Sequence, residues 1–281
     1  MSNCLMEEIA SDVVLEEAYA WLCRRRKNYS HNDEVWEVRF RWVEIKSRLQ
    51  CELIAGQYRF SPLRRIHRTN DDLEIWSAVD SLVLKAIAIV LTRQLAPSLS
   101  SRCFHLAGNG GAKAAIREIV ASLPKNQFIF RTDVKSYYAN IKHDILYAQL
   151  AEHLDDARLL DLLWLYMRRS VYDDGLYEDI DKGISLGCPL SPLMGALFLD
   201  VLDKRMEAMA VFYVRFMDDW VVLAPSRWKL RKAIALVNRT LAELDVEQHP
   251  DKHSLVKQNA SSRFWVTNEC GGANRCRPAN N

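Results

Sequence analysis

The chain has 281 residues, of which 49% are apolar, and a formal net charge of +2 at pH 7. This length and apolar content allow one large core or two modest ones, which excludes an intrinsically disordered protein. No apolar run approaches the roughly 20 residues that cross a bilayer, and no signal peptide is recognisable. The seven cysteines are scattered and odd in number. We therefore expect a globular cytoplasmic protein with reduced thiols, no membrane partner and no zinc site of paired cysteines.

The N-terminal part of the chain is predicted to be helical. Residues 1–55 carry apolar side chains at helical spacing, with basic residues on the other faces. Residues 56–70 are expected to be irregular or extended. Asp71 and Asp72 can then cap a helix that runs from about Leu73 to Leu95 and ends before a proline.

A glycine-rich segment and a short strand follow. Residues 108–111 precede a predicted helix over 112–122, and such loops can bind phosphate on their free N–H groups. A Gly-Lys-Ser/Thr step is lacking, however, so we favour a flexible turn. The apolar run from Phe128 to Val134 predicts a strand that ends in an acid, Asp133.

The middle of the chain predicts further helices and a polar hairpin. Helices are expected over 142–154 and 156–167, and a hairpin over 171–182 around an Asp-Asp-Gly turn. A long apolar helix is expected from Leu193 to about Met209.

The hairpin predicted over residues 212–223 carries the main functional signal. Two runs rich in β-branched and aromatic residues flank Asp218 and Asp219. Stable hairpin turns usually contain Asn-Gly, Asp-Gly or Gly-X, and adjacent carboxylates repel unless a cation lies between them. For the pair alone, a solvated acidic turn remains the commoner explanation. A helix over about 226–244, with Ser226 as its cap, and a short strand near 245–248 are expected next.

Three carboxylates in this pattern indicate chemistry with a hard divalent cation. Asp133 ends one strand, and Asp218 and Asp219 lie at the tip of the hairpin. If these strands are neighbours, their oxygens suit Mg²⁺, which keeps further positions for water and phosphate. Two such ions can activate a hydroxyl and stabilise a leaving pyrophosphate. The element order fits an α+β fold in which helices cover one face of an antiparallel sheet.

Four segments in order resemble the motifs of bacterial reverse transcriptases of the group II intron, retron and defence-associated lineage. They are residues 133–143, 183–193, 213–223 and 246–252, the third similar to the Tyr-X-Asp-Asp signature. The resemblance implies the fingers and palm of a right-hand polymerase. Because residues 258–281 do not resemble the family's continuation, it also implies an absent or truncated thumb.

The resemblance assigns roles to the acidic and basic residues. Asp133, Asp218 and Asp219 would bind two Mg²⁺ ions, or Mn²⁺, and the carbonyl of Val134 would help. Lys252 would approach the triphosphate and protonate the leaving pyrophosphate.

Further residues are implied to contact the nucleotide. Tyr138 would be the steric gate against a ribose 2′-hydroxyl, and Gly187 would let the chain pass close to the template. Arg65 and Lys113 are candidates to hold the triphosphate, and Arg64 and Arg68 are alternatives to them. Leu186 stands where the family usually has glutamine, which weakens the assignment of nucleotide contacts there. Outside the family context, these residues would be read as ordinary core, turn or surface positions.

The implied domains are an N-terminal helical extension at 1–55, fingers at 56–125, a palm at 126–257 and an irregular, disordered tail at 258–281. The implied activity is RNA-directed DNA synthesis: dNTPs are added to a DNA or RNA primer on an RNA template, in a mobile element or in antiviral defence. Two alternatives stay open. One is an RNA-templated RNA polymerase or a template-free polymerase on the same palm, and the other is a truncated, non-catalytic RNA-binding remnant.

Overall fold

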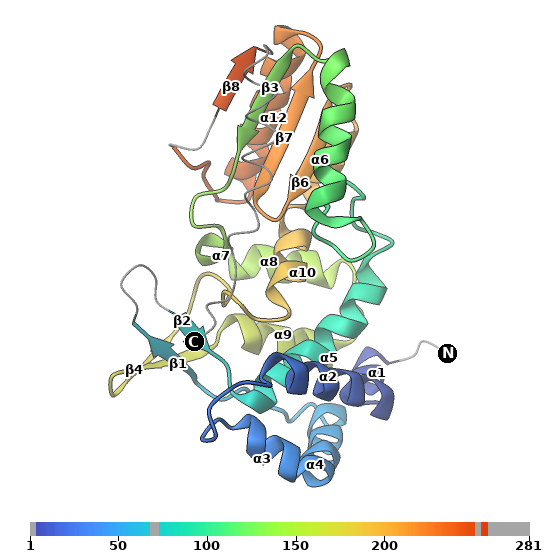
Figure 1. Ribbon diagram of the computed structural model, residues 1–281. Helices are drawn as coiled ribbons and strands as arrows, with labels where there is room; N and C mark the ends of the chain where they lie inside the picture. The colour runs from blue at the N-terminus through green and yellow to red at the C-terminus, as the bar shows by residue number, and fades with distance from the viewer. Residues whose placement is uncertain (1–3, 68–72, 251–253, 258–281) are drawn as a thin grey trace. The chain divides into compact units, whose positions relative to one another are not determined.

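The structure is a computed structural model that describes residues 4–67, 73–250 and 254–257. The chain forms two compact units, each built from two separate segments (Figure 1). Unit 1 comprises Met1–Pro97 and Ile141–Met194, and unit 2 comprises Ser98–Asn140 and Gly195–Asn281. The four domains expected from the sequence stay a prediction, and the tail predicted to be disordered lies outside the described residues.

Unit 1 is organised around the helix α5 (Ala78–Leu95), which is buried on nearly all its faces. The predicted N-terminal helices are confirmed, and α2 makes the most extensive packing contact with α5. The remaining helices of this unit are α1 (Leu5–Ile9), α2 (Asp12–Arg25), α3 (Val35–Phe40), α4 (Trp42–Ile54), α8 (His143–Ala151) and α9 (Ala157–Met167).

The predicted start of the α5 helix is wrong. Residues Leu73–Ile75 form the strand β2, and α5 begins only after Ser77, whose Oγ accepts the Asp80 N–H at 3.0 Å. The Asp80 carboxylate in turn accepts a hydrogen bond from the Ser77 hydroxyl at 2.7 Å, so Ser77 and Asp80 are joined by two hydrogen bonds at the start of the helix. The predicted cap, Asp71 and Asp72, lies outside the described residues.

A four-stranded sheet with the order β2-β1-β4-β5 completes unit 1. Its strands are β1 (Leu63–Ile66), β2, β4 (Ser170–Asp173) and β5 (Leu176–Asp179). The β4–β5 pair confirms the predicted polar hairpin. Its turn residues, Asp174 and Gly175, have φ of 44° and 98°, the left-handed conformation that a tight hairpin turn requires.

Unit 2 contains an antiparallel sheet with the order β6-β7-β3-β8. Its strands are β3 (Phe128–Thr132), β6 (Phe212–Phe216), β7 (Asp219–Ala224) and β8 (Ser254–Lys257). The predicted strand ending near Asp133 and the predicted Asp-Asp hairpin are both confirmed. The helices are α6 (Gly111–Ser122), α7 (Tyr137–Asn140), α11 (Asp200–Glu207) and α12 (Arg227–Glu243), and a short 3₁₀ turn covers Leu123–Lys125.

Helices cover both faces of this sheet, whereas the sequence predicted one covered face. Helix α6 packs against β6, and α12 packs against β3 and β7 on the other side (Figure 1). The reason is visible in β7, where five consecutive residues from Trp220 to Ala224 are buried, so neither face can be exposed to solvent. One face forms a core cluster with α6 that includes Ala115, Ile119, Ile129, Val214, Val221 and Leu223.

The prediction of one long helix between α9 and the Asp218 hairpin is wrong. The long helix expected from Leu193 to Met209 is interrupted at Leu199, so that α10 (Ser191–Phe198) and α11 are separate. The side chain of Asp200, at the start of α11, accepts the Ser100 N–H at 2.9 Å, a contact that fixes the break.

The strand expected near residues 245–248 is also wrong, because these residues make only an isolated bridge, between Val134 and Gln248. Strand β8 begins later and pairs with β3. No helix in the described part of the chain is long and apolar enough to cross a membrane.

Candidate active site

The sheet of unit 2 brings the three predicted carboxylates to one end of neighbouring strands. Thr132, the last residue of β3, pairs with Trp220. One further step along both strands places Asp133 opposite Asp219, and Asp218 precedes Asp219 in the turn between β6 and β7. Asp133 is 5% exposed, and the carbonyl of the same residue accepts the His249 N–H at 3.0 Å. The backbone therefore builds the predicted acidic edge.

The turn between β6 and β7 has an unusual backbone that is held from two sides. Phe216 pairs with Asp219, which leaves Met217 and Asp218 as the turn. Met217 has φ of 56°, a left-handed backbone conformation that residues other than glycine rarely adopt. Its N–H donates to His105 Nδ1 at 2.9 Å, and its carbonyl accepts from Arg215 Nη1 at 2.7 Å. These two hydrogen bonds fix the residue next to Asp218.

Arg215 is completely buried beneath this turn. It forms an ion pair with Asp203, which also accepts the Tyr213 hydroxyl at 2.7 Å, and it donates to the Ala196 carbonyl at 3.1 Å. Burial alone would lower the pKa of Arg215, but the Asp203 carboxylate outweighs burial and holds that pKa well above its usual value. The guanidinium is therefore a permanent cation, and each of its three nitrogens donates to a partner.

Asp219 faces a second cation. Arg131 of β3 donates to both of its carboxylate oxygens, at 3.2 and 3.3 Å, and the Asp219 side chain is 47% exposed. Within the described residues, the three aspartates are not among the groups whose ligand atoms all lie within 4.8 Å of one another. The donor chemistry, carboxylates with a backbone carbonyl beside them, nevertheless suits a hard cation such as Mg²⁺.

Tyr138 lies near enough to Asp218 for the carboxylate to affect its hydroxyl. Burial, and then the nearby Asp218 carboxylate, raise the pKa of the Tyr138 hydroxyl to about 12, so the phenol stays neutral. Its ring contacts that of Tyr137, with centroids 5.2 Å apart, and both rings lie over Gly195 of α10. The Tyr137 hydroxyl donates to the Gly195 carbonyl at 2.5 Å. The predicted gate thus lies within the electrostatic influence of a predicted metal ligand.

The other predicted residues lie elsewhere in the chain. Lys113 is exposed in the first turn of α6, in unit 2. Gly187 belongs to unit 1, has φ of 83°, and has no atom within 4 Å of the position a side chain would take. Arg65 also belongs to unit 1, and Lys252 lies outside the described residues. The structure brings Asp133, Asp218, Asp219 and Tyr138 together within one unit.

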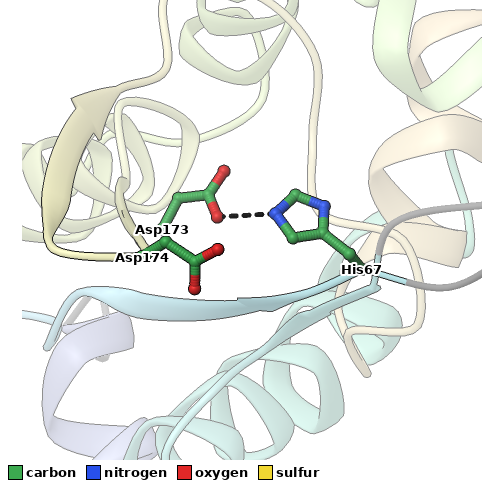
Figure 2. Close-up of side chains that lie close together, drawn as sticks. All are labelled: His67, Asp173 and Asp174. Carbon is green, nitrogen blue, oxygen red and sulfur yellow. Dashed lines mark hydrogen bonds and ion pairs between the residues drawn. The ribbon is translucent and has the colours of Figure 1, made fainter.

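A second acidic cluster lies in unit 1 beside Arg65. His67, Asp173 and Asp174 place possible ligand atoms within 4.8 Å of one another (Figure 2). Both carboxylate oxygens of Asp173 already have partners, because His67 Nε2 lies 2.8 Å from one oxygen and Arg65 donates to the other at 3.0 Å. Hydrogen bonding from His67, then from Arg65, lowers the pKa of the Asp173 carboxyl. We interpret this cluster as an ion-pair network of the sheet, since a guanidinium beside the ligands opposes cation binding.

Three residues that matter to the site are not singled out by sequence reasoning. Arg131 and Arg215 are cations within apolar strands, a pattern that indicates an anionic partner nearby. His105 lies in a loop with no motif, so only the fold reveals its contact with Met217.

Comparison with known proteins gives one family and several distant relatives. Residues 55–265 match the family described as reverse transcriptase (RNA-dependent DNA polymerase). Protein YkfC of Escherichia coli K12 is 24% identical over 169 residues, 57% of this chain and 44% of that protein. The group II intron-encoded protein LtrA of Lactococcus lactis subsp. cremoris is 21% identical over 211 residues, 73% of this chain and 35% of that protein.

A solved structure has a similar fold. A chain of a partial Cas6-RT-Cas1–Cas2 complex superposes with a TM-score of 0.53 at 21% identity, covering 86% of this chain and 42% of that chain. The present chain therefore spans less than half the length of these relatives.

Proposed function

Because this chain belongs to the reverse transcriptase (RNA-dependent DNA polymerase) family, we propose that it adds deoxynucleotides to a primer 3′-hydroxyl on an RNA template. Its fold is that of polymerase fingers and palm. The observation that carries the proposal is the placement of Asp218, in the turn after β6, and Asp219, at the start of β7, next to Asp133, with Tyr138 near Asp218.

The carboxylates would hold the divalent cations. Asp133 and Asp218, with Asp219 and the Val134 carbonyl, would bind Mg²⁺ or Mn²⁺, which when bound activates the primer hydroxyl and offsets charge on the leaving pyrophosphate. Asp219 would have to divide its oxygens between a cation and Arg131, which is its partner in the structure. Lys252 would supply the proton to the pyrophosphate.

Tyr138 would select the sugar. Its neutral phenol ring is held beside Asp218 by Tyr137 and Gly195, so a nucleotide bound at the carboxylates would meet the ring at its ribose. A 2′-hydroxyl would need the space of that ring. Gly187, with its left-handed backbone and open surroundings, would allow the template to approach the chain closely.

Lys113 is the better supported of the two proposed triphosphate residues. It is exposed, and no ion pair involving it is found among the described residues. Arg65 is paired with Asp173, Glu178 and Glu74 at 3.0, 2.9 and 3.7 Å. Binding a triphosphate there would require these carboxylates to be displaced, which costs free energy.

The biological setting follows from the relatives. One relative is named as a group II intron-encoded protein and another is part of a Cas6-RT-Cas1–Cas2 complex. We therefore propose a role in a mobile element or in antiviral defence, in the cytoplasm, with an RNA template and a DNA or RNA primer as partners.

Primer extension on an RNA template tests the function. We expect Mg²⁺-dependent extension with dNTPs and little with rNTPs, and we expect Asp218→Asn to reduce it by at least about 100-fold. Asp174→Asn is the matched control, because it changes an exposed turn aspartate in unit 1 and asparagine tolerates a left-handed backbone. Extension with rNTPs alone would favour an RNA polymerase. RNA binding without any extension by the wild-type chain would favour a non-catalytic protein.

A further inference from the structure

The Asp218 turn is hydrogen-bonded to a histidine, His105, that comes from another part of unit 2. Residues 102–104 run beside β6, because the Arg102 carbonyl accepts the Arg215 N–H at 2.9 Å and Phe104 N–H donates to the Arg215 carbonyl at 2.8 Å. This short parallel bridge, between Cys103 and Arg215, delivers the next residue, His105, to the turn. The imidazole also makes an edge contact with Phe216, with ring centroids 6.0 Å apart.

The contacts of His105 define which of its nitrogens accepts a hydrogen bond. Met217 N–H points at Nδ1 from 2.9 Å, and the Cys103 thiol lies 3.3 Å from the same atom. Burial raises the pKa of that thiol to about 12, so it keeps its proton. Both neighbours are donors, and Nδ1 must therefore be the unprotonated nitrogen of a neutral ring.

We propose that His105 is a positioning residue for the metal site: by accepting the Met217 N–H it holds the turn in the conformation that presents Asp218. The inference rests on the proposed function, since it assigns a role within the same site. The left-handed conformation of Met217 costs free energy, because Met217 has a side chain, and it therefore needs contacts that hold it in place. His105 restrains the peptide group that precedes the Met217 Cα, and the Arg215 bond to the Met217 carbonyl restrains the peptide group that follows it.

His105 is the better residue to change, because Arg215 is buried in an ion pair and its loss would strongly destabilise the unit. His105 is only partly buried. His105→Asn keeps an acceptor oxygen near the place of Nδ1, whereas His105→Phe keeps the ring against Phe216 and removes the acceptor. His153→Phe, a partly buried histidine of unit 1, is the matched control.

The first measurement is Mn²⁺ binding to the full chain without nucleotide, by calorimetry, with Asp218→Asn as the reference for loss of the site. We expect His105→Phe to weaken binding by about five- to tenfold, the factor for one lost hydrogen bond. We expect His105→Asn and His153→Phe to bind like the wild type. Equal binding by His105→Phe, or a loss in His105→Asn as large as in His105→Phe, would overturn the proposal.

The second measurement is hydrogen exchange at the Met217 amide by NMR, without metal. We expect faster exchange in His105→Phe and near wild-type exchange in His105→Asn, whereas unchanged exchange in both would overturn the proposal. This measurement also separates the two ideas. If the wild type shows no Asp218-dependent Mn²⁺ binding, the proposed function fails, and the Met217 amide still decides whether His105 holds the turn.

Discussion

Gly195 is the residue on which the Tyr138 ring rests. A methyl group there would lie 3.0 Å from Tyr137 Cε1 and 3.3 Å from Tyr138 Cε1, closer than ordinary contact. We expect Gly195→Ala to displace the Tyr138 ring, because overpacking of about 1–3 kcal/mol is relieved by the side chain that can move. The ratio of dNTP to rNTP incorporation, measured as kcat/KM, should fall.

Two variants complete this test. Tyr137→Phe removes the hydroxyl bond to Gly195 but keeps the ring, and it should leave the ratio unchanged. Tyr138→Ala should lower the ratio further than Gly195→Ala. If Tyr138→Ala leaves the wild-type sugar preference intact, Tyr138 is not the gate.

His143 makes unit 1 sensitive to acid. Burial lowers the pKa of its imidazole, and Nε2–H donates to the Gly183 carbonyl at 2.8 Å, so the folded protein keeps the ring neutral. The unfolded chain binds a proton near pH 6.5. The stability contributed by the neutral ring is therefore complete above about pH 6.5 and is lost as the pH falls through the lowered folded pKa.

Thermal unfolding can show this effect. Between pH 7.5 and 5.5, the midpoint of the wild type should fall further than that of His143→Gln, whose amide N–H can donate to Gly183 but does not titrate. If the unfolding midpoints of the two proteins fall by the same amount between pH 7.5 and 5.5, His143 is not the source of the acid sensitivity.

At the scale of an element, a single side chain, that of Ser226, caps the N-terminus of α12. Ser226 Oγ accepts the Lys229 N–H at 3.3 Å, and no acidic residue lies in the first turn of the helix. Ser226→Ala should cost about 1 kcal/mol of unfolding free energy in urea titrations. Ser226→Asp should recover that loss, because an anion there also favours the positive end of the helix dipole. An equal loss in both variants would mean that the cap does not stabilise α12.

Elements with local signals are predictable from the sequence, and elements with distant partners are not. The Asp218 hairpin and the Ser226 cap are each determined by residues that are close in sequence. Both predictions are confirmed. The break at Leu199 depends on Asp200 meeting Ser100, and β8 depends on its pairing with β3. Periodicity contains no information about such contacts.

The same distinction holds for the candidate site. The three aspartates follow from strand ends and from the family resemblance, whereas their roles stay a prediction. Arg131 and His105 act through partners that are remote in sequence, and Arg215 is held by Asp203, which lies on another element. No pattern around His105 indicates that its imidazole meets Met217.

At the scale of the whole molecule, the two units should respond separately to a core mutation in one of them. Arg215→Met leaves Asp203 as a buried carboxylate without its cation, which should destabilise unit 2 by about 3–5 kcal/mol. Hydrogen exchange followed by mass spectrometry should show lost protection in residues 98–140 and 195–250. Peptides from residues 4–67 and 141–194 should keep theirs. Uniform loss across the chain would show that the units unfold as one.

The order of strands in unit 2 also has a consequence for synthesis of the chain. Strand β3 lies between β7 and β8, and its residue Phe128 pairs with Ala224 of β7. The β6–β7 hairpin is local and can form within microseconds, but β3 must wait on the ribosome until residues 219–224 have emerged. The intervening segment 141–194 meanwhile belongs to the other unit. Asp133 and Asp218 thus become neighbours only late in biogenesis, after much of the chain has already been made.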